Sequence, residues 1–128
     1  MARARILVAD DVPAWRAQVR TVLLGYADWE IIAEACDGLE AVRHAADLQP
    51  DLALLDIGMP SLNGIAAAVE IRKRCPECKI VFLTQDSDPA IRDAALAAGA
   101  CGYVIKGKAA TDLIPTITEA LRNGRRGF

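Results

Sequence analysis

The run Leu52-Ala53-Leu54-Leu55, followed by Asp56, indicates the fold. An uninterrupted apolar run of this length is typical of a strand that is buried on both faces, as strands are in parallel sheets. Comparable apolar runs recur along the chain, at residues 5–9, 30–34, 79–83 and 102–105. The run at 30–34 begins and ends with glutamate, which favours an edge strand. The sequence therefore predicts five strands.

Helical periodicity fills the stretches between these runs and after the last one. One apolar stripe is formed by Val12, Trp15, Val19, Val22 and Leu23. Later stripes are followed by helix-ending residues, at Pro50, Pro76, Gly99 and Gly124. We expect Pro115 in the first turn of the last helix, because a proline further along would kink it. The order βαβαβαβαβα predicts an α/β protein with helices on both faces of a parallel sheet.

Length and charge narrow the functional classes. The 128 residues fit one domain over residues 1–128, and the net charge of -2 argues against direct binding of nucleic acid by this domain. No apolar run approaches a membrane-spanning length, and the N-terminus does not resemble a secretory signal, so we expect a cytoplasmic protein. The end of the chain at residues 125–128, Arg-Arg-Gly-Phe, favours a fragment cut before a further domain.

The cysteines do not indicate a metal or redox centre. Cys75 and Cys78 form the one C-x-x-C pair, and the only histidine is His44. A zinc site needs a second pair or nearby histidines, and a redox pair normally begins a helix rather than preceding a strand. Ordinary reduced cysteines are the favoured interpretation.

Polar side chains follow four of the predicted strands, at the point where each strand ends. They are Asp10 and Asp11, Asp56, Thr84 and Lys106. Taken singly, each has an ordinary role as a helix cap, a turn residue, a strand residue or a surface lysine. Ligands of open α/β sheets bind at the carboxyl ends of the strands, so together these residues predict one site.

The chemistry of this set is that of phosphoryl transfer. Three carboxylates on one rim repel one another unless a hard cation such as Mg²⁺ neutralises them. A carboxylate beside the ion can then attack phosphorus and form an aspartyl phosphate. Lys106 would place positive charge on the phosphoryl oxygens, and Thr84 would donate a hydrogen bond.

With these residues in place, the chain resembles the receiver domains of two-component response regulators over about residues 6–121. The resemblance lies in the acidic pair, the segment 51–64 with Asp56, the segment 82–84 and the segment 102–106. It implies a flavodoxin-like, doubly wound (βα)5 sandwich with strand order 2-1-3-4-5. Gly107 stands where many receivers have a cis proline, so no cis bond is expected there. This pattern is similar to the subfamily with helix-turn-helix output domains.

The resemblance also assigns the residues of the acceptor site. It implies that Asp56 is the phospho-acceptor and that Asp11 and Asp56 bind Mg²⁺ directly. The backbone carbonyl of Gly58 would be a third protein ligand, and Asp10 would act through a bound water. Gly58 and Asp86 occupy positions that tune the lifetime of the phosphorylated state in the family, but the sequence does not predict that lifetime.

The same resemblance implies a switch. Lys106 and Thr84 would contact the phosphoryl group, and Tyr103 would turn inward when Thr84 moves toward it. The alternative for Tyr103 is an ordinary half-buried aromatic near the sheet edge. The expected output face combines the fourth helix, the fifth strand and the fifth helix. The alanines of the fourth helix, at 90, 94, 95, 97 and 98, either suit a partner or let the helix lie close to the sheet.

The implied partners are a histidine kinase that donates the phosphoryl group and an output domain, a protein partner or a second copy in a homodimer. The chain would be no enzyme beyond its own phosphorylation and dephosphorylation. One alternative is a Mg²⁺-dependent phosphohydrolase, which needs an Asp-x-Asp motif, but Val12 stands two residues after Asp10. A second is a binding module that is never phosphorylated, although such receivers usually lose a key residue. A flavin carrier would need a hydroxyl-rich loop after the first strand.

Overall fold

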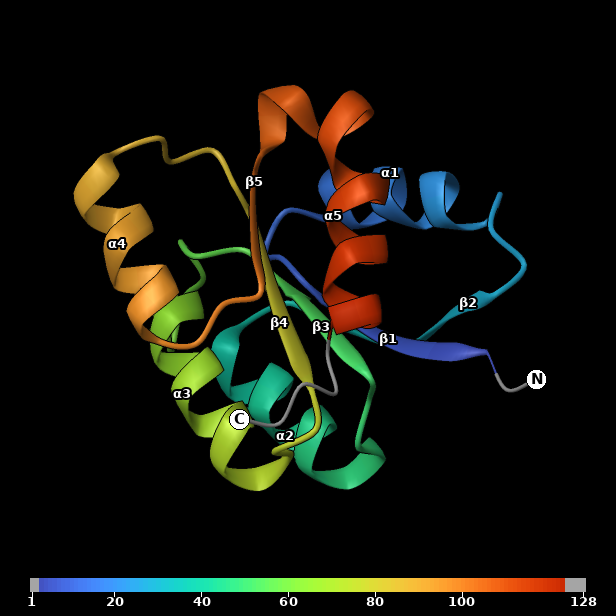
Figure 1. Ribbon diagram of the computed structural model, residues 1–128. Coiled ribbons are helices and arrows are strands. Elements are labelled where there is room, and N and C mark those ends of the chain that lie inside the picture. Colours follow the sequence, from blue (N-terminus) through green and yellow to red (C-terminus); the bar gives the residue numbers. More distant parts are fainter. Residues whose placement is uncertain (1–2, 124–128) are drawn as a thin grey trace.

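The computed structural model describes residues 3–123 as one βα-alternating unit (Figure 1). Its strands are β1 (Ala4–Ala9), β2 (Trp29–Ala35), β3 (Leu52–Leu55), β4 (Lys79–Thr84) and β5 (Gly102–Ile105). Its helices are α1 (Pro13–Leu23), α2 (Gly38–Leu48), α3 (Gly64–Arg74), α4 (Pro89–Ala97) and α5 (Ala109–Asn123). A short 3-10 turn, η1 (Lys106–Lys108), joins β5 to α5. None of the helices between residues 3 and 123 is both long and apolar enough to cross a membrane.

The five strands form one parallel sheet in the order β2-β1-β3-β4-β5. This order confirms the flavodoxin-like, doubly wound fold. Strand β2 lies at an edge, as its glutamate-flanked sequence predicted. Its register against β1 shifts between Ile6 and Leu7, a local irregularity at that edge.

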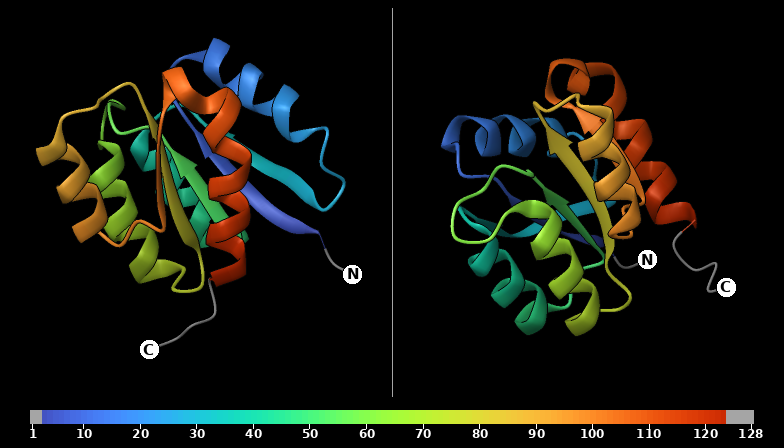
Figure 2. Two further views of the ribbon diagram at one scale, coloured as in Figure 1. Left: turned by 45° about the horizontal axis from the view of Figure 1, so that its top comes forward. Right: turned by 90° about the vertical axis from the view of Figure 1, so that its left-hand side faces the viewer.

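Alternating side chains of the sheet build two separate cores. On one face, residues such as Leu7, Leu55 and Phe82 pack with α2, α3 and α4. On the other, Ile6 and Leu54 pack with α1 and α5. Figures 1 and 2 show this division, with α1 and α5 on one side of the sheet and the other three helices on the opposite side. Burial of the strands on both faces explains their nearly unbroken apolar sequences.

Local signals fix most helix ends. Asp37, Asn63 and Asp88 cap α2, α3 and α4 by accepting a hydrogen bond from a backbone N–H in the first turn. Gly99, with a φ of +99°, follows α4 in the left-handed conformation that glycine tolerates.

The expectations for two helices need correction. Helix α5 begins at Ala109, so Pro115 lies inside it and not in its first turn. The helical apolar pattern of the last segment begins only at Leu113, about one turn after Ala109, so the pattern does not show where the helix begins. In α1, the predicted stripe is only partly buried: Val19 and Leu23 lie in the core, whereas Val12 and Val22 are exposed.

Two glycines, at the starts of α2 and α3, allow the backbone to pack closely against the loop after β3. The N–H of Gly64 donates to the carbonyl of Ile57 at 2.7 Å. A Cβ on Gly64 would lie 2.1 Å from the carbonyl oxygen of Asp56, and one on Gly38 would lie 1.8 Å from that of Leu62. Both neighbours are backbone atoms that cannot swing aside. The starts of α2 and α3 therefore clamp the loop that follows Asp56.

This clamp predicts that Gly64→Ala destabilises the domain by about 1–3 kcal/mol, because the added methyl group would collide with the backbone of Asp56. Urea unfolding measures the change in the free energy of unfolding. Gly107→Ala is the matched control, since a Cβ at Gly107 would meet no atom within 4 Å. Equal stabilities of the two variants would contradict the clamp.

Candidate functional site

The register of the sheet aligns the ends of its central strands. Ala9 of β1 pairs with Leu55 of β3, and Thr84 of β4 pairs with Ile105 of β5. The N–H of Asp56 donates to the carbonyl of Ala9 at 2.9 Å, which ties the two strand ends together. The residues that follow these ends therefore lie at one rim, as the sequence predicted.

Three carboxylates gather at this rim. Asp10, Asp11 and Asp56 each offer an oxygen, and these oxygens all lie within 4.8 Å of one another. Asp10 and Asp56 are buried, whereas Asp11 is exposed. Carboxylate oxygens are the ligands that hard divalent cations prefer. The donor set therefore fits Mg²⁺.

Lys106 lies across the carboxylates. Its ammonium nitrogen is 2.8 Å from Asp10 Oδ2 and 3.7 Å from Asp56 Oδ1, and its side chain is only 4% exposed. The other carboxylate oxygen of Asp10 accepts a hydrogen bond from the N–H of Val12 at 2.9 Å. A buried ion pair of this kind is tolerated because each charge has an opposite charge or a hydrogen-bond partner in place of water.

The environment of Asp56 opposes its ionisation. Burial raises the pKa of the Asp56 carboxyl above its ordinary value, and the charges of Asp10 and Asp11 add to this effect. Lys106 lowers the pKa, as does a hydrogen bond from the N–H of Gly58. A further positive charge at the rim would favour the ionised, nucleophilic form.

Backbone atoms of Asp86 connect Thr84 with Tyr103. The Thr84 hydroxyl oxygen accepts a hydrogen bond from the N–H of Asp86 at 3.2 Å. The Tyr103 hydroxyl donates to the carbonyl of Asp86 at 2.7 Å. The guanidinium of Arg92 lies 6.0 Å from the centroid of the Tyr103 ring. In this arrangement the half-buried Tyr103 is held at the loop between β4 and α4.

A cleft of about 300 Å³ opens over these groups. Its lining includes Asp11, Asp56, Gly58, Thr84 and Lys106, so it unites most of the predicted site residues. Asp10 lies buried against Lys106 and is not part of the lining, and Tyr103 lies outside it.

Four residues of the lining had no place in the sequence-based site: Val12, Trp15, Ile57 and Gln85. The signal for Trp15 was its position four residues after Asp11, about one helical turn. The signal for Gln85 was its position directly after Thr84, where a strand-end site continues into its loop.

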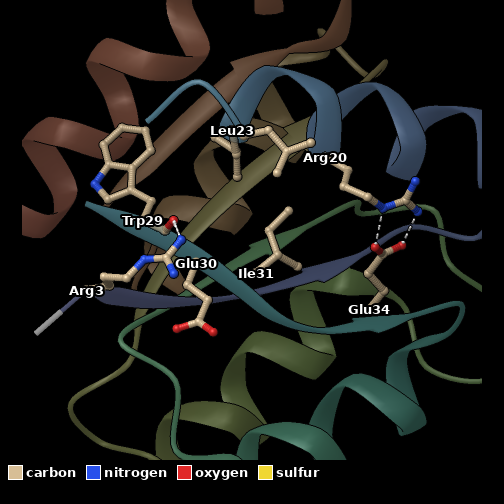
Figure 3. A pocket seen from close by; sticks show the side chains of 8 residues that line it. Arg3, Arg20, Leu23, Trp29, Glu30, Ile31 and Glu34 are labelled. Atoms are coloured by element: carbon tan, nitrogen blue, oxygen red, sulfur yellow. Dashed lines mark hydrogen bonds and ion pairs between the residues drawn. The ribbon is translucent and has the colours of Figure 1, made fainter. Parts of the chain in front are cut away.

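A separate hollow lies between α1 and the edge strand β2 (Figure 3). Its volume of about 340 Å³ is slightly larger than that of the cleft over Asp56. Two of its charged residues are paired with each other: Arg20 donates to both carboxylate oxygens of Glu34, at 2.8 and 2.9 Å. Arg3 donates to the backbone carbonyl of Trp29 at 3.0 Å. Unlike the rim, this hollow holds no gathering of like charges that a ligand would relieve.

Comparison with known proteins agrees with the geometry. Residues 6–118 match the family model of the response regulator receiver domain. The uncharacterized transcriptional regulatory protein YxjL of Bacillus subtilis is 35% identical over 120 residues, which cover 94% of this chain and 55% of YxjL. The response regulator protein VraR of Staphylococcus aureus is 32% identical over 123 residues, 96% of this chain and 57% of VraR. The chain thus spans about half the length of these curated relatives.

Solved structures show the same fold at similar identity. A two-component response regulator of the LuxR family from Aurantimonas aligns with a TM-score of 0.90 and 31% identity, covering 97% of this chain and 89% of that one. The receiver domain of the putative response regulator NarL from Mycobacterium tuberculosis aligns with a TM-score of 0.89 and 28% identity, covering 95% and 98%. By sequence and by structure, the chain belongs to the receiver domain family of two-component response regulators.

Proposed function

We propose that the carboxylate of Asp56 accepts a phosphoryl group from the phosphohistidine of a partner histidine kinase. An Asp56 oxygen attacks phosphorus, the bond between phosphorus and the kinase imidazole breaks, and the imidazole leaves with the electron pair. The observation that carries this proposal is the meeting of Asp10, Asp11 and Asp56 with Lys106 at one rim of the sheet. Phosphoryl transfer depends mainly on such positioning and charge.

Mg²⁺ is the cofactor that this donor set suits. Asp11, Asp56 and the backbone carbonyl of Gly58 would hold it, with Asp10 contributing through a bound water. When bound, the ion would supply positive charge that neutralises the carboxylates and the incoming phosphoryl oxygens.

Lys106 and Thr84 are the protein groups that would bind the transferred phosphoryl group. The Lys106 ammonium is already 3.7 Å from Asp56, so a short movement away from Asp10 brings it to an oxygen on phosphorus. The Thr84 hydroxyl lies at the end of the adjacent strand and lines the same cleft.

The readout would begin at Thr84. A hydrogen bond from its hydroxyl to the phosphoryl group draws the oxygen away from the N–H of Asp86 and so disturbs the loop that holds Tyr103. We propose that Tyr103 then turns inward and changes the face formed by α4, β5 and α5. Among the alanines of α4 and its end, at 90, 94, 95, 97 and 98, only Ala95 is fully buried. The others leave a smooth outer surface on α4 for a partner.

The proposed partners follow from the family. The relatives YxjL and VraR are about twice as long as the matched segment, and the response regulator RcsB from Salmonella has been solved bound to promoter DNA. We propose that the α4-β5-α5 face controls an output domain, a separate protein or a second copy of the chain. Catalysis would be limited to the chain's own phosphorylation and dephosphorylation, and the domain would work in the cytoplasm beside its kinase.

Incubation with Mg²⁺ and acetyl phosphate should add one phosphoryl group to the protein, detected by intact mass. Hydroxylamine should remove it, because it is an acyl phosphate. Asp56→Asn should form no adduct, whereas Asp47→Asn, an exposed carboxylate on α2, should behave as the wild type. A wild-type protein that binds Mg²⁺ but forms no adduct would favour the binding module that is never phosphorylated.

Removal of the lysine charge should make the fold depend on Mg²⁺. Lys106→Met leaves Asp10 buried beside two other carboxylates and should lower stability by on the order of 3 kcal/mol without the ion. Added Mg²⁺ should then raise the melting temperature more than it does in the wild type. Lys73→Met, which removes an exposed ion pair with Glu70, is the control and should change stability by less than about 1 kcal/mol. An equal response of Lys106→Met and wild type to Mg²⁺ would argue against charge crowding at the rim.

A further inference from the structure

Trp15 lies against the amine that the proposed reaction uses. The Lys106 ammonium nitrogen is 4.8 Å from the centroid of the Trp15 ring. Both residues line the cleft over Asp56, and both also line a second hollow of about 210 Å³ between α1 and the start of α5. The indole and the ammonium thus stand together at the boundary between the site and the neighbouring groove.

An aromatic ring is a distinctive neighbour for an ammonium. Its negative face attracts the cation, most strongly for tryptophan, and the attraction grows when the cation is withdrawn from water. The ring occupies a side of the ammonium that water would otherwise take, while Asp10 holds another side at 2.8 Å. Unlike a further carboxylate, the ring carries no net charge, so it fixes the ammonium without neutralising it.

The helix that carries Trp15 is firmly placed. Val19 and Leu23 anchor α1 in the core, and Pro13 occupies its first helical position. The guanidinium of Arg16 donates to the backbone carbonyl of Asp10 at 2.6 Å, which ties the start of α1 to the end of β1. A ring on such a rigid support can define the position of a flexible lysine.

We propose that Trp15 is a positioning residue for phosphoryl transfer, whose ring holds the Lys106 ammonium in place beside Asp56. This inference rests on the proposed function, because it assigns Trp15 a role through the lysine that would bind the phosphoryl group. It applies to the transfer step and not to the carboxylates that would hold Mg²⁺.

The first test compares Trp15→Leu, which keeps an apolar side chain, with Trp15→Phe, which keeps an aromatic face. At saturating Mg²⁺, the initial rate of phosphorylation by acetyl phosphate should fall about tenfold in Trp15→Leu and less in Trp15→Phe. Mg²⁺ affinity, measured by calorimetry, should remain that of the wild type in both. Ile71→Val, a core change on α3 at the opposite face of the sheet, should lower the melting temperature and leave the rate unchanged.

The second test is a double-mutant cycle with Lys106→Met. If Trp15 acts through the lysine, Trp15→Leu should cause no additional loss of rate in the Lys106→Met background. In the wild type without phosphodonor, the ε-protons of Lys106 should show an upfield ring-current shift in NMR spectra that is lost in Trp15→Leu.

Three results would overturn the proposal: additive losses in the cycle, equal losses in Trp15→Leu and Trp15→Phe, or a loss as large in Ile71→Val. If the wild type forms an adduct and Trp15→Leu forms it at the same rate, this inference alone fails. If the wild type forms no adduct, the proposed function fails and the role of Trp15 fails with it.

Discussion

The crowding of negative charge at the carboxyl rim of the sheet is the constraint on which the site depends. Asp10 and Asp56 are withdrawn from water by the same packing that builds the core, and Asp11 stands beside them at the surface. The ammonium of Lys106 offsets only part of this charge. The rim is therefore short of positive charge in the folded state, and the rest of the site can be understood as a response to that shortage.

The sheet creates the crowding because it is parallel and buried on both faces. Parallel strands end at the same edge, so the residue after each strand reaches the same rim whatever the helix between them does. Two cores, one on each face, leave the central strand β3 no exposed residue before Asp56. The chemistry and the apolar strand sequences are thus two aspects of one architecture.

Much of this was accessible from the sequence, and the part that was not has a physical reason. Apolar runs located the strands, and the residues after them located the site, since both depend on local sequence alone. The strand order came from family resemblance, because periodicity does not say which strands are neighbours. The true start of α5 escaped prediction because its first turn, from Ala109, carries little apolar pattern. The contacts of Lys106 with Asp10 and of Trp15 with Lys106 join elements far apart in the chain, and no local pattern encodes the rotamers that make them.

The loop after β3 and the loop after β4, which lie on either side of the acceptor Asp56, differ in how tightly they are held. Beyond Asp56, the chain is wedged between the starts of α2 and α3, where Gly38 and Gly64 leave no space for even a methyl group. Beyond Thr84, the exposed loop is held by a few hydrogen bonds that involve side chains, such as the one from the N–H of Asp88 to the Asp86 carboxylate at 2.9 Å and the one from the Tyr103 hydroxyl to the Asp86 carbonyl at 2.7 Å. The loop after Asp56 is therefore more tightly constrained than the loop after Thr84. If Asp56 accepts a phosphoryl group as proposed, we expect the loop between β4 and α4 to shift rather than the loop after β3, which would direct the change toward the α4 side of the domain.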